Sequence, residues 1–304
     1  MIDLVSKRFW YFLISAVVIV PGLFSLLLPG GLKWGIEFTS GSAMTLSFDS
    51  SVEQAGLRAE LAELGYDEAI IQRTGGGSFL VRTREITAEE KGRLEMDLEE
   101  RLGPLQVLDF YSVSPVVASE IRPKAMIAVS LAAIGILLYI SWAFRRIPKP
   151  FRYGSCAIVA LAHDVLVVLG IFSILGRLFN IQIDAMFITA VLAVVGYSVN
   201  NTVVVFDRVR ENLGKEISRQ FEVVVGRSLV ETVSRSLNTS LTTVFVLVAL
   251  YLFGGVTIRN FILVLILGTI AGTYSSLLIA GQLLVVWEKG ELGRLWRRVV
   301  PARE

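Results

Sequence analysis

The chain has 304 residues, of which 54% are hydrophobic, and its mean hydropathy is +0.64. This composition excludes an ordinary soluble domain and indicates an integral membrane protein. The net charge of +2, without basic runs interleaved with aromatic residues, excludes a nucleic-acid partner. One cysteine and one histidine exclude an intrachain disulfide, a thiolate metal cluster and a histidine-rich metal site.

The first apolar segment runs from Phe9 to Leu28 and follows Lys7 and Arg8. Its 20 residues are enough to cross the hydrocarbon core of a bilayer. A signal peptide also has a positive start, but its apolar run is shorter and ends in a small-residue cleavage site. Because this run ends in Leu-Pro-Gly-Gly, we interpret residues 1–29 as an uncleaved transmembrane helix.

Residues 30–124 have the composition of a water-exposed domain, with 16 acidic and 10 basic residues and no long apolar run. Ser51 and Thr87 are typical helix N-caps, and Thr87-Ala-Glu-Glu is a capping box. The glycine triplet at 75–77 predicts a hairpin turn rather than a phosphate-binding loop, because no helix follows it. The order β-α-β-β-α-β predicts a ferredoxin-like unit. Its predicted strands are Ala43–Phe48, Ala69–Thr74, Ser78–Thr83 and Leu105–Val113, and its predicted helices cover 51–65 and 87–102.

Five further apolar segments bring the number of predicted transmembrane helices to six. They are Ala125–Phe144, Tyr153–Gly176, Ala185–Phe206, Leu237–Gly255 and Phe261–Trp287. We therefore expect a five-helix transmembrane region at 125–288 and a cytoplasmic tail at 289–304. Beside the spans, 17 Lys and Arg residues lie on the side of the two termini, against two in the short loops on the opposite side. The positive-inside rule predicts cytoplasmic termini, which places residues 30–124 on the far side of the membrane.

The segment 207–236 is too polar to span a membrane, yet its apolar residues recur at helical spacing. We interpret residues 208–234 as an amphipathic helix that lies along the cytoplasmic interface, with a solvated loop as the alternative. In the last span, Gly268 and Gly272 form a small-xxx-small pair, which predicts a close contact with another helix.

The fourth span is uncharged between Asp184 and Asp207 but polar at its centre, where Ser198, Asn200 and Asn201 lie. Amides in hydrocarbon must face other helices or a water-filled path. The simpler interpretation is that these amides only hydrogen-bond across a helix interface. Two adjacent asparagines point about 100° apart on an α-helix, so one interface cannot satisfy both. A buried polar site that faces two neighbours is therefore the alternative.

Two ionisable residues complete the candidate network. Asp164 follows His163 near the middle of the third span, where a charge is costly and marks a functional candidate, with a structural pair as the alternative. Arg235 precedes a hydroxyl-rich start of the fifth span and is either a positive-inside anchor or a buried counter-ion. Such an interior network suits the passage of protons or other ions. The candidate proton-pathway residues are Asn201, Arg235, Asp164, Asn200, Ser198 and Thr239.

Four motifs resemble the SecF subunits of the bacterial protein-export machinery, in the SecD/SecF family of the RND superfamily. They are Gly35-Ile-Glu-Phe-Thr-Ser-Gly after the first span, His163-Asp164-Val-Leu in the third, the run from Gly196-Tyr-Ser to Asn212 in the fourth, and Arg235-Ser-Leu-Asn-Thr-Ser-Leu-Thr-Thr in the fifth. The resemblance covers essentially the whole chain. It implies a six-span subunit that pairs with SecD about a pseudo-twofold axis. It also implies work beside the SecYEG channel, where proton flow helps to draw preproteins across the membrane.

The fourth span departs from the family pattern, which usually reads Gly-Tyr-Ser-x-Asn-Asp. The resemblance implies that this Asp carries the proton and that Arg235 is its partner. This chain has Asn201 there, and an amide does not titrate. Either the proton chemistry lies elsewhere in this chain, or Asn201 is an engineered replacement that imitates the protonated acid, and the intact motif around it favours engineering. Ser40-Gly41 also replaces the usual glycine pair.

The sequence thus favours an α-helical protein of the bacterial inner membrane with an extracytoplasmic ferredoxin-like domain and no cofactor. The expected function is that of a proton-motive-force-driven accessory subunit of the Sec translocon. The alternatives are a non-conducting scaffold subunit and one half of an RND-type exporter. The expected partners are SecD, SecYEG, the preprotein, protons and the lipid bilayer, with YajC and YidC as further candidates. No Walker loop, credible nucleophile or metal-ligand spacing supports an enzyme.

Overall fold

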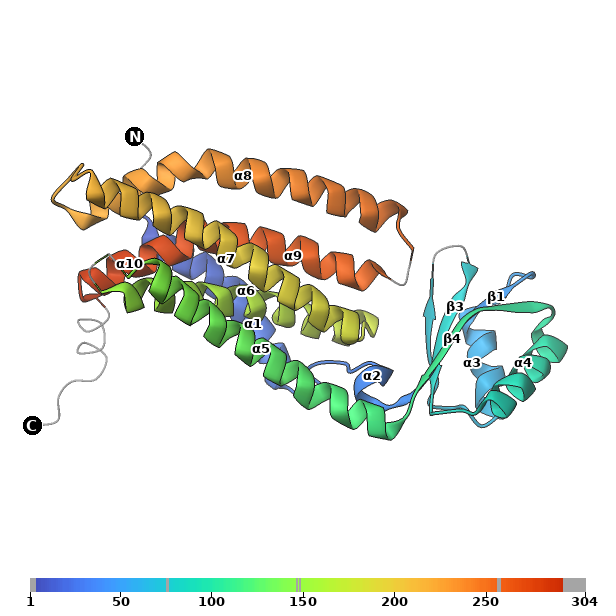
Figure 1. Ribbon diagram of the computed structural model, residues 1–304. Coiled ribbons are helices and arrows are strands. Elements are labelled where there is room, and N and C mark those ends of the chain that lie inside the picture. Colours follow the sequence, from blue (N-terminus) through green and yellow to red (C-terminus); the bar gives the residue numbers. More distant parts are fainter. Residues whose placement is uncertain (1–3, 75–76, 146, 148, 256–257, 292–304) are drawn as a thin grey trace, which may run out of the picture. The chain divides into compact units, whose positions relative to one another are not determined.

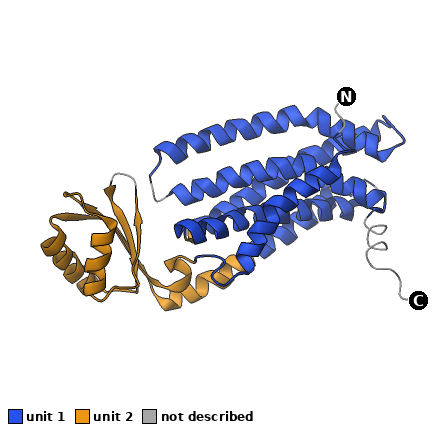
Figure 2. Ribbon diagram, turned by 180° about the vertical axis from the view of Figure 1, so that it is seen from behind, with its two compact units in different colours: residues 1–33, 128–181, 186–304 blue, residues 34–127, 182–185 orange. Residues whose placement is uncertain are grey.

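The structure is a computed structural model that describes residues 4–74, 77–145, 147, 149–255 and 258–291 (Figure 1). The chain divides into two compact units, which Figure 2 shows in different colours. The helical unit comprises residues 1–33, 128–181 and 186–304, and the α+β unit comprises residues 34–127 and 182–185. The predicted tail at 289–304 lies, from residue 292 on, outside the described residues.

Among the described residues, six helices are long and apolar enough to cross a membrane, which confirms the predicted number of spans. In the helical unit these long helices run side by side (Figure 1). The first five are α1 (Arg8–Leu27), α5 (Pro115–Ala143), α6 (Pro150–Phe179), α7 (Ala185–Gly214) and α8 (Phe221–Phe253). The sixth is continuous through α9 (Arg259–Ser275), a π-helical turn η3 (Ser276–Ala280) and α10 (Gly281–Glu288).

The helices extend beyond the apolar runs of the sequence, most clearly around residues 207–236. Residues 208–214 continue α7, and residues 221–234 form the first part of α8, so that no separate amphipathic helix lies between them. The apolar residues of this segment still pack inward, because Val224, Val225 and Leu229 are fully buried. The helical periodicity therefore predicts the helical structure and its buried side, whereas the prediction of a helix separate from the neighbouring spans is wrong.

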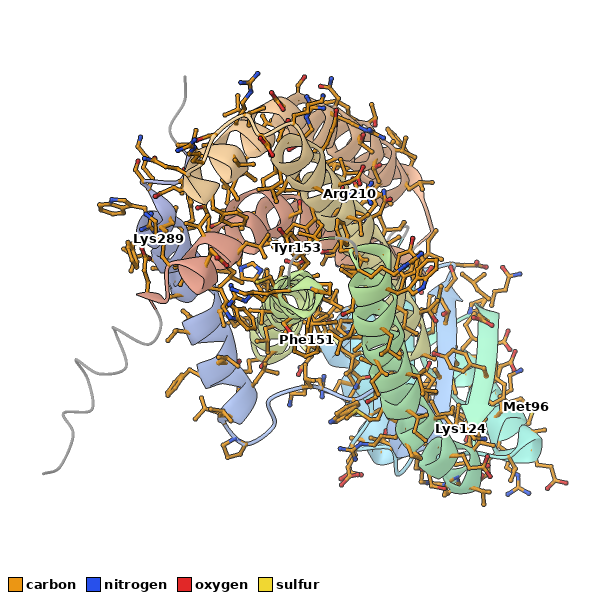
Figure 3. The ribbon with its side chains drawn as sticks, turned by 60° about the vertical axis from the view of Figure 1, so that its left-hand side comes forward. Met96, Lys124, Phe151, Tyr153, Arg210 and Lys289 are labelled. Carbon is orange, nitrogen blue, oxygen red and sulfur yellow. The ribbon has the colours of Figure 1, made fainter. Side chains whose placement is uncertain are left out.

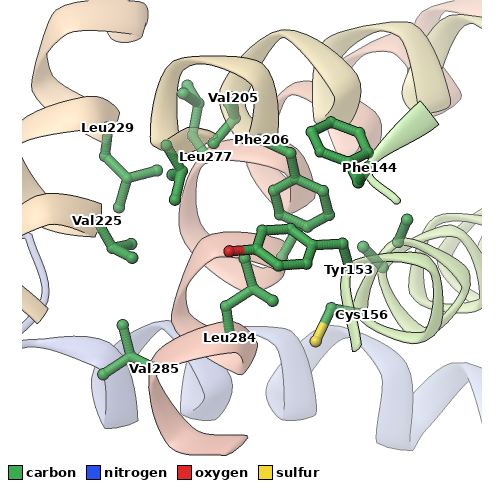
Figure 4. Packing of buried hydrophobic residues seen from close by; sticks show 14 of the residues in the cluster. Phe144, Tyr153, Cys156, Val205, Phe206, Val225, Leu229, Leu277, Leu284 and Val285 are labelled. Atoms are coloured by element: carbon green, nitrogen blue, oxygen red, sulfur yellow. The ribbon is translucent and has the colours of Figure 1, made fainter. Parts of the chain in front are cut away.

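An aromatic group holds one end of the helical unit together. Phe144 stacks on Tyr153 with ring centroids 5.6 Å apart, and both rings meet Phe206 of α7 edge-on (Figure 4). Tyr153 lies toward the middle of the helices, whereas Phe151, two residues earlier on α6, is 61% exposed (Figure 3). A helix in lipid needs close packing on only one side, because lipid can cover the apolar residues on its other sides.

Helix α1 packs closely against α6. A Cβ atom at Gly22 would lie 2.7 Å from the Cα atom of Gly170, so only glycine permits this approach. Toward the end of α1, the Ser25 and Ser173 hydroxyls lie 2.7 Å apart. Arg177 donates hydrogen bonds to the Ser25 carbonyl at 2.9 Å and to the Leu28 carbonyl at 3.0 Å. These bonds satisfy carbonyls that the end of a helix leaves unpaired.

The predicted close contact of Gly268 and Gly272 is confirmed. A Cβ atom at Gly272 would lie 2.9 Å from the Ser198 Cβ atom of α7, and one at Gly268 would overlap Val194. The small residues therefore let the sixth span approach the polar part of α7.

The α+β unit is built on a four-stranded antiparallel sheet with the strand order β2-β3-β1-β4. This order and the sequence of elements are those of a ferredoxin-like unit, as predicted. Its core is apolar and includes Leu57, Leu61, Phe79, Val81 and Leu98, each no more than 1% exposed. The elements are α2 (Ile36–Thr39), β1 (Gly41–Phe48), α3 (Gln54–Glu63), β2 (Ile70–Arg73), β3 (Phe79–Thr83), α4 (Ala88–Leu102) and β4 (Leu105–Val113).

The helix N-termini and the hairpin turn of this unit agree with the sequence predictions only in part. The capping box is confirmed, because the Thr87 hydroxyl accepts from the Glu90 N–H and the Glu90 carboxylate accepts from the Thr87 N–H. The prediction of Ser51 as an N-cap is wrong, since α3 begins at Gln54 after an extended Glu53. Strands β2 and β3 pair as a hairpin, but residues 75 and 76 of the predicted glycine turn lie outside the described residues.

Candidate functional site: a buried polar cluster among the spans

Asp164 is the centre of a polar cluster inside the helical unit. It is the fifteenth of the 30 residues of α6 and is 0% exposed. The helix is apolar before and after it, so α6 forms regardless of this one charge and carries the carboxylate between its neighbours. A fully buried carboxylate is costly unless its oxygens are hydrogen-bonded.

Three side chains bond the Asp164 carboxylate. The Ser198 hydroxyl of α7 donates to Oδ2 at 2.5 Å, and the Ser275 hydroxyl of α9 donates to the same oxygen at 2.8 Å. Nδ1 of His163 lies 2.9 Å from Oδ1. Three spans therefore converge on one carboxylate, and both of its oxygens are bonded.

The His163 imidazole connects the carboxylate with α1. Its Nε2 atom lies 2.9 Å from the hydroxyl of Ser15, which is itself buried. The ring stacks on Tyr274, with centroids 5.9 Å apart and planes at 21°. The Tyr274 hydroxyl donates to the Tyr11 carbonyl of α1 at 2.7 Å, which fixes the stacking partner. Both ring nitrogens thus have polar partners on different spans.

A second layer of hydroxyls joins α7, α8 and α9. The Tyr197 hydroxyl donates to Ser240 Oγ at 3.0 Å, and Ser240 Oγ lies 2.6 Å from Thr273 Oγ1. Thr273 also donates to the Thr269 carbonyl one turn earlier at 2.7 Å. The hydroxyl-rich middle part of α8 therefore faces the interior at Ser240.

Asn201 is buried, with 4% of its surface exposed. Its Nδ2 atom makes no hydrogen bond within the described part of the chain, and the same is true of Ser236 Oγ on α8. A buried donor without a partner costs about 1–3 kcal/mol, so position 201 is not optimised for an amide in this chain alone.

The other predicted site residues do not join the cluster. Asn200, Arg235 and Thr239 all have exposed positions on α7 and α8. The Thr239 hydroxyl only donates to the Arg235 carbonyl of its own helix, at 3.0 Å. Of the six candidate residues, the structure brings Asp164 and Ser198 together, buries Asn201 one turn away along α7, and leaves these three on the surface.

Sequence reasoning missed Ser15, Ser275 and Tyr274, which complete the cluster. A serine in a span is common, and nothing in its own neighbourhood shows which way it faces. The one local signal was the pair of Gly272 and Ser275, since small residues mark a close helix contact. Among the described residues, no group of three or more His, Cys, Asp or Glu side chains is placed to hold a metal ion.

The α+β unit contains a partly buried acid of its own. Burial raises the pKa of Glu37 above its ordinary value and the Asp184 carboxylate raises it further, whereas Arg82 and the Tyr111 hydroxyl oppose this. Tyr111 donates to Glu37 Oε1 at 3.4 Å. Burial, together with the Glu37 charge, raises the pKa of Tyr111 to about 12, so that it stays a donor at neutral pH.

The fold and the cluster define a class: a multi-pass membrane protein with a ferredoxin-like unit between its first two spans and an ionisable site among its spans. Two family models match the sequence. "Protein export membrane protein SecD/SecF, C-terminal" matches residues 95–290, and "SecD/SecF GG Motif" matches residues 30–52. The chain belongs to the SecD/SecF family.

Relatives and solved structures agree with this assignment. The chain is 46% identical to a protein translocase subunit SecF of Thermobaculum terrenum, over 99% of this chain and 98% of that one. It is 33% identical to the protein translocase subunit SecDF of Bacillus subtilis, over 95% of this chain and 38% of that one. The crystal structure of the translocon-associated membrane protein SecDF of Thermus thermophilus matches with a TM-score of 0.84 at 32% identity, over 95% of this chain and 39% of that one. The chain therefore spans about two fifths of the SecDF chains and nearly the whole of a SecF subunit.

Proposed function

We propose that this protein is an accessory subunit of the Sec translocon that uses the proton-motive force to promote preprotein translocation. The similarity to translocase subunits over nearly their whole length supports the translocation role. The observation that carries the proton-driven part is Asp164, a fully buried carboxylate bonded by side chains from two other spans. An ionisable group inside a membrane is costly and marks an ion pathway by default.

The exposed polar residues of α7 and α8 support SecD as the partner in the membrane. On α7, Thr189, Ala193, Gly196 and Asn200 are exposed and recur at intervals of four, three and four residues, which places them on one face. On α8, Arg235 and Thr239 are exposed one turn apart. Polar groups at such depth are costly in lipid, and small residues allow close helix packing. We therefore assign this face, with Asn200, Arg235 and Thr239, to the contact with SecD.

The remaining assignments follow from charge and from the relatives. The excess of Lys and Arg beside the termini supports cytoplasmic ends in a bacterial inner membrane, with residues 30–124 on the opposite side. There the α+β unit is in a position to meet preprotein leaving SecYEG, with YajC and YidC as further candidate partners. A proton moving through about 100 mV supplies about 2.3 kcal/mol, so a few protons are enough to rearrange a small domain.

A non-conducting scaffold subunit is the second candidate. It is favoured by Asn201, which cannot titrate, and by the complete bonding of Asp164, which is compatible with a purely structural role.

Proton flux into vesicles that contain the chain together with SecD and SecYEG separates the two. We expect Asn201→Asp to raise the flux about tenfold or more, because it restores an acid that can exchange protons. When Asp164→Asn is added to the Asn201→Asp variant, we expect the flux to fall to background. Asp207→Asn, at an exposed residue beyond the polar part of α7, is the matched control and should leave flux unchanged. Equal flux in all variants, with translocation intact, would establish the scaffold.

A further inference from the structure

The single histidine of the chain is a buried ionisable residue with a polar partner at each ring nitrogen. His163 is 9% exposed and lies directly beside Asp164 in the middle of α6. Its two ring nitrogens have different partners, since Nδ1 lies 2.9 Å from Asp164 Oδ1 of the same helix and Nε2 lies 2.9 Å from Ser15 Oγ of α1. An imidazole bonded on both sides can take up a proton at one nitrogen and release one at the other.

We propose that His163 is a proton-relay residue that connects Asp164 with the hydroxyl of Ser15, so that the proton route passes between α6 and α1. This inference rests on the proposed proton-driven function and adds the path by which protons reach the carboxylate. It assigns a role to α1, which contains none of the candidate residues that the sequence suggested.

The transfer can be followed atom by atom. With Asp164 ionised, Nδ1–H donates to Oδ1, and Nε2 accepts from the Ser15 hydroxyl. When a proton from water arrives at Ser15 Oγ, the serine passes its own hydroxyl proton to Nε2, and Nδ1 gives its proton to Oδ1. One proton has entered, Asp164 is neutral, the hydroxyl is restored, and the imidazole has changed from the Nδ1–H to the Nε2–H tautomer.

The surroundings of the ring suit this exchange. Among the described residues, the imidazole has hydrogen-bond partners in Asp164 on α6 and Ser15 on α1 and a stacking partner in Tyr274 on the sixth span, and Asp164 is the charged one of these. Beyond the carboxylate, α7 and α9 present the hydroxyls of Ser198 and Ser275. Stacking on Tyr274 keeps the ring plane in place, so a change of tautomer needs no change of position.

The distance between Ser15 and the ring is held by contacts elsewhere on the same helix pair. The glycine contact of Gly22 with Gly170 lies two turns further along α1, and the Ser25 to Ser173 bond lies beyond it. Helix α1 therefore presents the Ser15 hydroxyl at a fixed depth opposite His163. A relay requires such a fixed geometry, because a proton moves only across a formed hydrogen bond.

Nuclear magnetic resonance of the chain in lipid tests the relay directly. Because the chain has one histidine, labelling with ¹⁵N-histidine gives the signals of a single imidazole. We expect the bonded proton to move from Nδ1 to Nε2 as the pH is lowered across the range in which the protein stays folded, and this change to be lost in Asp164→Asn. A tautomer that stays the same over this range in the unmodified chain would overturn the relay, whatever the behaviour of any variant.

Flux measurements on chains that carry Asn201→Asp give the second readout. His163→Gln keeps an amide between the same partners but cannot relay, and we expect it to lower flux about 100-fold. Ser15→Ala should lower flux to a similar extent, because the proposed route passes through the Ser15 hydroxyl that bonds Nε2. The matched control is Ser141→Ala, which removes a buried hydroxyl of α5 that makes no bond within the described residues, and its flux should be unchanged.

The outcomes separate the relay from the proposed function. If flux is absent from the Asn201→Asp variant even with His163 in place, the proton-driven function fails. If flux is present and His163→Gln retains it, only the relay fails. If His163→Gln does not assemble with its partners, Ser15→Ala and the ¹⁵N spectrum still decide the question.

Discussion

The two units of the molecule place polar and apolar side chains in opposite positions. In the α+β unit, Leu57 and Leu98 are fully buried and charged residues cover the helices. In the helical unit, Phe245 is 68% and Phe253 90% exposed, while Asp164 is 0% exposed. In water, burying apolar side chains is favourable, as in the α+β unit, whereas in lipid apolar side chains can remain exposed, as in the helical unit. The two units are therefore adapted to different solvents. The stability of the α+β unit should therefore depend on the volume of its buried apolar side chains, and that of the helical unit on close helix contacts and on hydrogen bonds between polar side chains.

The largest expected effect is on the core of the α+β unit. Leu98→Ala removes a fully buried side chain from α4 and should lower the free energy of unfolding of this unit by about 2–5 kcal/mol. Hydrogen exchange of the full chain in lipid measures this unit separately. Met96→Ala, on the exposed face of the same helix (Figure 3), is the control and should change little. An equal loss of protection in α1 and α6 would show that the two units do not respond separately.

In the helical unit the corresponding change adds a methyl group instead of removing a side chain. Gly22→Ala places a Cβ atom against the Gly170 backbone and should lower stability in detergent by about 1–3 kcal/mol. Gly135→Ala, where an added Cβ atom meets no neighbouring helix within 4 Å, should be neutral or slightly stabilising, because alanine favours helix. Thermal aggregation of the two variants gives the comparison. Equal behaviour would mean that the close contact of α1 with α6 does not govern stability.

A smaller effect is expected from the cap of α4. Thr87→Ala removes the side-chain acceptor for the Glu90 N–H and should cost about 1 kcal/mol in the α+β unit. Thr87→Ser keeps the hydroxyl and should retain most of the stability. Exchange rates of the first amides of α4 report the difference, and a Ser variant as weak as the Ala variant would contradict the capping role.

The smallest effect depends on pH. Because burial raises the folded-state pKa of Glu37, its contribution to stability is complete below the ordinary value of 4.5 and is lost as the pH rises through the raised value. Glu37→Gln should therefore remove this decline and leave the α+β unit more stable than wild type at neutral pH. Tyr111→Phe should move the decline to higher pH, because the Tyr111 hydroxyl lowers the pKa of Glu37. Urea unfolding at several pH values measures both, and parallel profiles for all three proteins would refute the assignment.

Local patterns predicted most of the fold and part of the site. Apolar runs and caps identify spans and strands because each depends on neighbours in sequence. They also located Asp164 and Ser198, whose polarity is conspicuous in an apolar helix. Adjacent residues of an α-helix point about 100° apart, which predicts that Asn200 and Asn201 face different surroundings. In the structure Asn201 is buried and Asn200 is exposed.

The rest of the site depends on how each helix is rotated, which its own sequence does not determine. Ser15 and Ser275 could not be selected from the other serines, because only packing turns them toward His163 and Asp164. Polarity predicts that Arg235 and Thr239 face away from lipid, but it does not say whether their neighbours belong to the same chain. The extent of α7 and α8 was underestimated for a similar reason, since a helix can continue past the membrane wherever packing supports it.

The π-helical turn at Ser276–Ala280 changes the direction in which the side chains point between the first and second part of the sixth span. In a uniform α-helix, side chains seven residues apart differ in direction by only about 20°, so those of Ser275 and Gln282 would point to the same side of the helix. Instead Ser275 donates to Asp164, while Gln282 donates to the Leu4 carbonyl at 3.2 Å. The wider turn shifts the phase of everything after it. One helix can thus hydrogen-bond to two different parts of the chain, Asp164 through Ser275 and Leu4 through Gln282. Deleting one residue between 276 and 280 would rotate one part of the helix relative to the other, so that one of these two hydrogen bonds would be lost.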